Sequence, residues 1–149
     1  MSYSYFVADL HCPGCGSTTG ASVTTKVESE PGTVIRVGDR LEVTVTDMEL
    51  SHYKVRDPAP GEPLRILEPW SCPNCGRPEW VEVVVADGAV RSIEVAPFDV
   101  ATLDRVHFVD SEVTDFYTEV TGEPLYVGND IRPDWAARLR AGLALSVKR

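Results

Sequence analysis

The sequence lacks the features that mark membrane and nucleic-acid-binding proteins. No apolar run approaches the roughly 20 residues that a membrane-spanning helix needs. Positive charge is scarce, because 14 lysine and arginine residues stand against 23 aspartate and glutamate residues and leave a formal net charge of −9. Nucleic-acid backbones and anionic membranes both attract clustered positive charge, so this composition argues against both as partners. The N-terminus also lacks the basic segment of a signal peptide, and we expect a cytoplasmic protein.

Patterns typical of common active sites are missing as well. The three histidines, His11, His52 and His107, are dispersed, and no H-x-x-x-H pattern occurs. There is no glycine-rich phosphate loop followed by Lys-Ser, and no G-x-S-x-G nucleophile motif. Four aspartates could pair as acid and base but are interpreted as part of a solvated acidic face: Asp99, Asp104, Asp110 and Asp115. We therefore predict no catalytic residues in this chain.

The four cysteines, by contrast, form one repeated motif. They read Cys12-Pro-Gly-Cys15-Gly and Cys72-Pro-Asn-Cys75-Gly. In each copy the proline fixes φ in the bend, and the last glycine can adopt a positive φ that brings backbone N–H groups close to the thiolates. Two such knuckles supply four sulfurs in the tetrahedral arrangement that Zn²⁺ prefers. These four cysteines are the predicted zinc ligands.

Alternatives to zinc remain open at this point. A single C-x-x-C could be a redox pair, and two disulfides could form, although a reducing cytosol disfavours the disulfides and the duplicated proline and glycine favour a metal. Iron could occupy the same knuckles, as in a rubredoxin-like electron carrier, but rubredoxins are much shorter than 149 residues. His11 could compete as a ligand, yet four sulfurs already complete the shell. Because a four-thiolate site has no open position for substrate or water, we expect the metal to be structural.

Hydrophobic patterning predicts a mainly β (α+β) fold in which residues 1–149 form a single zinc-ribbon-based domain. The knuckles, at 12–16 and 72–76, are separated by a β-hairpin-rich insertion over 17–71 and followed by a hairpin and helices over 80–149. The strongest turn signal is Asp87-Gly88, which joins strands 80–86 and 89–95, and Gly38-Asp39 predicts a second hairpin from 33–37 and 41–46. Further strands are predicted at 3–10, 23–28, 52–56, 64–67 and 106–109.

Two short helices are predicted near the C-terminus. The first spans 112–121, where Ser111 can cap its start and Gly122 can end it. It carries an apolar stripe with i, i+3, i+4, i+7 spacing, formed by Val113, Phe116, Tyr117 and Val120. The second begins near Pro133 or Asp134 and places Trp135, Leu139 and Leu143 on one face. Because aromatic residues dominate interface energetics, the predicted interface residues are Phe116, Tyr117 and Trp135.

The order of short motifs in the second half carries a family resemblance. The segments are Val55-Arg-Asp57, Arg65-Ile-Leu, the knuckle at 72–76, Val81-Glu-Val, Asp110, and Asp115-Phe-Tyr-Thr-Glu-Val-Thr-Gly-Glu-Pro124. Together they cover roughly residues 52–127, with the first knuckle as an upstream partner. This order resembles the small zinc-binding gamma subunit of acetone carboxylase, and the similar subunit of acetophenone carboxylase is a related possibility.

The resemblance implies a non-catalytic subunit that docks on larger hydantoinase-like chains, which carry out ATP-dependent ketone carboxylation. As functional residues it implies only the four cysteines, as zinc ligands. A hydantoinase-like complex that is not a carboxylase stays open. Two other hypotheses also remain: a free-standing zinc-ribbon adaptor that recruits a protein partner, and a small iron electron carrier. In each docking hypothesis the acidic charge of the chain fits a partner with a basic face.

Overall fold

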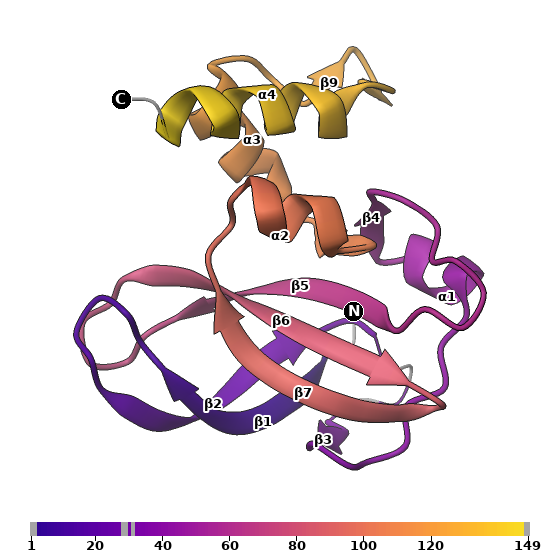
Figure 1. The fold of residues 1–149 in the computed structure, drawn as a ribbon, viewed down its shortest axis with the longest axis vertical. Helices are drawn as coiled ribbons and strands as arrows, with labels where there is room; N and C mark the ends of the chain where they lie inside the picture. The colour runs from indigo at the N-terminus through magenta and orange to yellow at the C-terminus, as the bar shows by residue number, and fades with distance from the viewer. Residues whose placement is uncertain (1–2, 28–29, 31, 148–149) are drawn as a thin grey trace.

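The computed structural model describes residues 3–27, 30 and 32–147 of the chain, and residue 28 of the predicted strand 23–28 lies outside them. Within the described residues the fold is mixed α+β, built mostly of strands with four short helices. Figure 1 shows a layer of helices on one side of a central sheet and a smaller sheet on the other. The predicted α+β class is therefore confirmed.

The central sheet has five strands in the order β4-β8-β5-β6-β7. Only β5 and β8 pair in parallel, and the other neighbours are antiparallel. The β6–β7 hairpin turns at Asp87-Gly88, as predicted, with both residues at positive φ. The bounds are β4 (His52–Lys54), β5 (Leu64–Ser71), β6 (Pro78–Ala86), β7 (Ala89–Ala96) and β8 (Phe108–Asp110).

The smaller sheet has the order β2-β1-β3. Its antiparallel pair consists of β1 (Ser4–His11) and β2 (Thr18–Thr25), so the predicted second strand begins earlier than expected. The short β3 (Val34–Ile35) adds to the other edge of β1 in parallel. A separate two-stranded ribbon, β9 (Tyr126–Val127) with β10 (Asp130–Ile131), precedes the last helix.

The predicted hairpin from 33–37 and 41–46 is wrong. Residues 38–41 pair instead with the β6–β7 hairpin. In this pairing the Leu41 backbone N–H donates to the Gly88 carbonyl at 2.9 Å. The following residues begin helix α1 (Val45–Glu49) rather than a strand. Thr44 and Asp47 form a capping box, in which each side chain accepts from the backbone N–H of the other. This local signal outweighs the alternating pattern of valines that suggested a strand.

The helical layer contains α2 (Val100–Arg105), α3 (Val113–Thr121) and α4 (Trp135–Val147), which correspond to one unpredicted and two predicted helices. Asp99 caps α2 through its side chain. Ser111 does not cap α3, because Glu112 is the N-cap residue and makes no side-chain cap hydrogen bond. Gly122 ends α3 in the left-handed conformation, as predicted, with φ at 74°.

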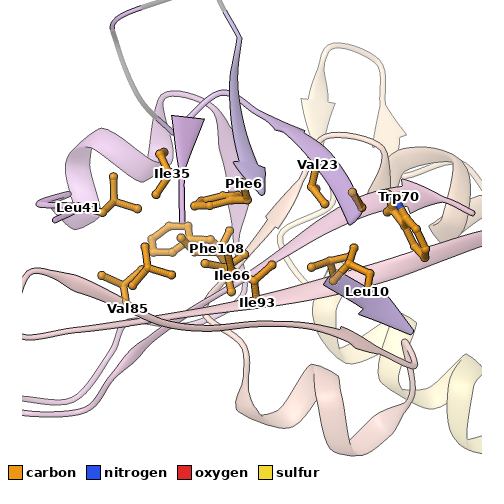
Figure 2. Close-up of a cluster of buried hydrophobic side chains, with 14 of the residues drawn as sticks. Phe6, Leu10, Val23, Ile35, Leu41, Ile66, Trp70, Val85, Ile93 and Phe108 are labelled. Carbon is orange, nitrogen blue, oxygen red and sulfur yellow. The ribbon is translucent and has the colours of Figure 1, made fainter. Parts of the chain in front are cut away.

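Strand alternation divides the core into two clusters on opposite faces of the central sheet. Ile66 and Phe108 point toward the smaller sheet and meet Phe6, as Figure 2 shows. Leu67 and Val109, one residue further along each strand, point toward the helices. Both faces of the central sheet are thus buried, which holds the two sheets and the helices together.

Two of the three predicted interface residues are core residues. Tyr117 is fully buried and Trp135 is 6% exposed, because α3 and α4 turn these side chains toward the central sheet. Phe116 is only half-buried and packs against Trp80 and Phe98, with ring centroids 5.8 and 4.4 Å away. Of the three, only Phe116 remains available to a partner.

A buried carboxylate joins the central sheet to α2. Glu82 in β6 accepts hydrogen bonds from Arg105 at 2.8 Å and from Arg65 at 3.1 Å. Burial alone would raise the pKa of Glu82, but these two guanidinium groups lower it below the ordinary value of 4.5.

A lowered folded-state pKa makes stability depend on pH in a defined direction. The contribution of Glu82 is complete above pH 4.5 and is lost as the pH falls through the lower, folded pKa. We expect Glu82→Gln to cost about 1.5–3 kcal/mol at pH 7, since hydrogen bonds to charged groups are lost. In urea unfolding, the difference between parent and variant should shrink toward pH 3. A difference that is constant with pH would contradict this assignment.

Candidate metal centre

Each cysteine motif closes the end of an antiparallel hairpin. Cys12 follows β1, and its backbone N–H donates to the Ser17 carbonyl at 2.9 Å just before β2 begins. Inside this turn the Gly16 N–H donates to the Cys12 carbonyl at 2.8 Å. Gly16 has φ at 74°, a conformation that favours glycine, so the motif requires glycine here.

The second knuckle repeats this geometry between β5 and β6. The Gly76 N–H donates to the Cys72 carbonyl at 2.8 Å, and the Cys72 N–H donates to the Arg77 carbonyl at 3.1 Å. Gly76 has φ at 73°, nearly identical to its counterpart in the first knuckle. The sequence repeat therefore corresponds to a repeat of local structure.

Packing of the two sheets brings the two knuckles together. Below them, Leu10 of β1 and Trp70 of β5 belong to the same buried cluster, labelled in Figure 2. The knuckles approach closely at Gly14, where a Cβ atom would lie 2.7 Å from the Arg77 side chain. The sulfurs consequently meet although the motifs are far apart in the sequence.

The four sulfur atoms form a compact group. The Sγ atoms of Cys12 and Cys75 lie 3.7 Å apart, as do those of Cys15 and Cys72. Four sulfurs at about 2.3 Å from a tetrahedral zinc ion are separated by about 3.8 Å. Both of these pairs join opposite knuckles, so one ion would be shared by both hairpins. The four cysteines are thus placed where they could hold a metal ion, as predicted.

The surroundings of the sulfurs favour thiolates at two positions. Hydrogen bonds from the Ser17 side chain and backbone lower the pKa of Cys15 to about 6. A backbone hydrogen bond from Cys75 is the main cause that lowers the pKa of Cys72. Cys12 and Cys72 are buried while Cys15 and Cys75 are exposed, so one edge of the cluster faces solvent.

Among the residues that the structure describes, two of the three histidines belong to no group of potential metal ligands. His11 is exposed and its Nδ1 pairs with the Thr18 hydroxyl at 3.1 Å, so it is no part of the cysteine cluster. His107 is fully buried: its Nδ1 accepts from the Arg65 backbone N–H at 3.0 Å, and its Nε2 pairs with Glu62 at 2.8 Å. This second pair ties the proline-rich loop before β5 to the sheet.

Sequence reasoning missed a second group of potential ligands. His52, Glu68 and Asp110 are all buried, and their ligand atoms lie within 4.8 Å of one another. Asp110 was interpreted as part of a solvated face, which is wrong for this residue because it is 7% exposed. The available signal was Glu68, a charged residue in the otherwise apolar run 66–70 of β5.

Comparison with known proteins adds no relative: no family model, no curated protein and no solved structure matches this chain. None of the helices in the described part of the chain has the length and apolar character needed to span a membrane. The function of the chain is therefore inferred from the geometry of the site and from the motifs of the sequence.

Proposed function

We propose that the four cysteines hold one structural Zn²⁺ ion and that the two knuckles form a zinc ribbon. The observation that carries this proposal is the 3.7 Å separation of sulfurs from opposite knuckles, which fits the edge of a ZnS₄ tetrahedron. Redox use of each C-x-x-C would instead favour sulfur pairs within a knuckle. Four thiolates leave no coordination position open, so the ion would pin the β1–β2 hairpin to the β5–β6 hairpin.

For the biological role, we propose a non-catalytic zinc-binding subunit of an ATP-dependent ketone carboxylase or a related hydantoinase-like complex. Support comes from the order of motifs over residues 52–127, a range that contains all five strands of the central sheet. A second support is the acidic outer side of α3, where Glu112, Asp115 and Glu119 are exposed. They border a groove that Phe116 also lines, and this combination suits a partner with a basic, partly apolar face.

Purification of the tagged full-length chain from its native host tests both parts of this proposal. We expect a colourless preparation with zinc at one ion per four-cysteine site, together with large hydantoinase-like chains identified by mass spectrometry. Phe116→Ala should weaken recovery of those chains while leaving the zinc of this site in place. Lys54→Ala is the matched control, because Lys54 lies in the edge strand β4, forms an exposed ion pair with Glu49 and does not line the groove; it should change neither readout.

Each alternative has its own outcome in the same experiment. A visible absorption band together with iron in the preparation would show that the site holds iron instead of zinc, and would favour an electron carrier. Recovery of the chain alone, or with unrelated partners, would contradict the carboxylase-like role and favour a free-standing zinc-ribbon adaptor.

A further inference from the structure

A second group of potential metal ligands lies between the two sheets. His52 begins β4, Glu68 lies within β5 and Asp110 ends β8. The geometry points to a second metal site, in which His52, Glu68 and Asp110 bind one divalent transition-metal ion such as Zn²⁺, Mn²⁺ or Fe²⁺. One imidazole and two carboxylates are a ligand set that suits these borderline ions.

Strand register explains why the three side chains meet. His52 is directly opposite Asp110 in the antiparallel β4–β8 pair. The parallel β8–β5 pair aligns Val109 with Leu67, and one step further along both strands places Asp110 beside Glu68. The three residues therefore form a row across three neighbouring strands, on one face of the sheet. A row held by sheet hydrogen bonds positions ligands with little loss of conformational entropy on binding.

Hydrogen bonds on both ring nitrogens hold His52 in this group. The Nε2 atom of His52 lies 2.6 Å from Glu68 Oε1, and its Nδ1 atom pairs with the Ser51 hydroxyl at 2.7 Å. Metal-bound histidines usually have such a partner on the second nitrogen, which orients the ring. Ligands about 2.1 Å from an ion lie at most about 4.2 Å apart, and the ligand atoms of the three residues lie within 4.8 Å of one another.

An unpartnered oxygen points to a ligand in the same place. The Glu68 side chain is fully buried, and its Oε2 atom has no hydrogen-bond partner among the described residues. A buried carboxylate oxygen without a partner is costly, and a cation removes that cost. A divalent ion would balance the negative charge of the two carboxylates.

The pair formed by His107 and Glu62 provides an internal comparison. Its Nε2–Oε1 distance is 2.8 Å and its histidine is also fully buried. Glu62, however, is 39% exposed, and the pair belongs to no group of three potential ligands among the residues that the structure describes. Asp110, in contrast, also lines the groove beside α3, which gives an ion a path of entry. The two histidine–carboxylate pairs thus differ in the features that a metal needs.

Cobalt(II) added to full-length protein that carries one zinc ion per chain, at the four-cysteine site, tests the inference. We expect one Co²⁺ per chain to bind in addition to the zinc, with weak visible bands and without the intense sulfur-to-cobalt charge transfer of a thiolate site. Glu68→Gln should abolish this uptake, whereas the matched variant Glu62→Gln should bind as the parent does. Zinc content should remain the same in all three proteins.

Two results would overturn the site. Zinc-loaded parent protein that takes up no Co²⁺ at millimolar concentration would make the three residues a buried ion-pair network instead. Equal uptake by the parent and by Glu68→Gln would place the ion elsewhere. If Glu68→Gln does not fold, X-ray absorption of the cobalt-loaded parent decides: a shell of nitrogen and oxygen with imidazole scattering supports the site, and sulfur in that shell contradicts it.

Discussion

Cys72→Ser is expected to cause the largest loss of stability of any substitution considered for this chain. The serine hydroxyl stays protonated at neutral pH and leaves the metal with three thiolates. Structural zinc binding contributes about 10–16 kcal/mol in small zinc-dependent peptides, which is comparable to the whole stability of a typical domain. Even a loss of about 4 kcal/mol lowers Tm by roughly 8–16 °C in a chain of this size. Thermal melting followed by circular dichroism, together with metal analysis, measures both effects.

Asn74→Gly is the matched control for this substitution. It converts the second knuckle into Cys-Pro-Gly-Cys, the form of the first knuckle, and retains all four thiolates. We expect it to keep its zinc and to melt within a few degrees of the parent. A strong chelator should destabilise the parent and this control while having little further effect on Cys72→Ser. If Cys72→Ser melts like the parent and keeps its metal, the structural-zinc proposal is wrong.

Tyr117→Ala is expected to have the second largest effect. The Tyr117 side chain is fully buried in the cluster between the central sheet and the helices, and its hydroxyl donates to Glu123 at 2.8 Å. Truncating a buried aromatic side chain leaves a cavity and costs about 3–5 kcal/mol. The lost hydrogen bond adds to that cost, because the Glu123 carboxylate loses one of its partners. Glu123 still pairs with Arg132 and Arg138. Urea unfolding of the purified variant measures the change.

Phe116→Ala separates core packing from an interface role at the neighbouring position. Since Phe116 is half-buried, we expect a smaller cost of about 1–2 kcal/mol, less than that of fully burying an aromatic ring. Tyr117→Phe, which keeps the ring, should cost about 1 kcal/mol through the hydroxyl alone. A Tyr117→Ala variant as stable as Phe116→Ala would contradict the core assignment of Tyr117.

The cysteine cluster could be read from the sequence because its chemistry is local. Each knuckle needs only proline and glycine at fixed positions beside two cysteines, and these residues determine the same turn twice. Duplication of the motif was enough to predict a shared site. The distance between the knuckles along the chain gave no information on how they approach, which depends on packing of β1–β2 against the central sheet.

The wrong prediction of a hairpin over 33–46 shows what an alternating hydrophobic pattern does not specify. Alternating valines are compatible with a strand, yet they do not specify its partner. The structure uses Ile35 in a parallel pair with β1, and a capping box at Thr44 begins a helix. A capping box is itself a short-range signal, and giving it more weight would have corrected this part of the prediction.

The sequence by itself determined the acidic composition of the chain and its four candidate metal ligands. Composition argued against nucleic acid and membranes as partners, and the repeated C-P-x-C-G motif specified four candidate ligands. The row of His52, Glu68 and Asp110 was decided by tertiary structure alone, because strand register between β4, β8 and β5 joins residues that no sequence spacing relates. Likewise, side-chain burial decided that Tyr117 stabilises the core while Phe116 stays accessible. Local turn chemistry is encoded in neighbouring residues, whereas register and burial depend on contacts across the whole fold.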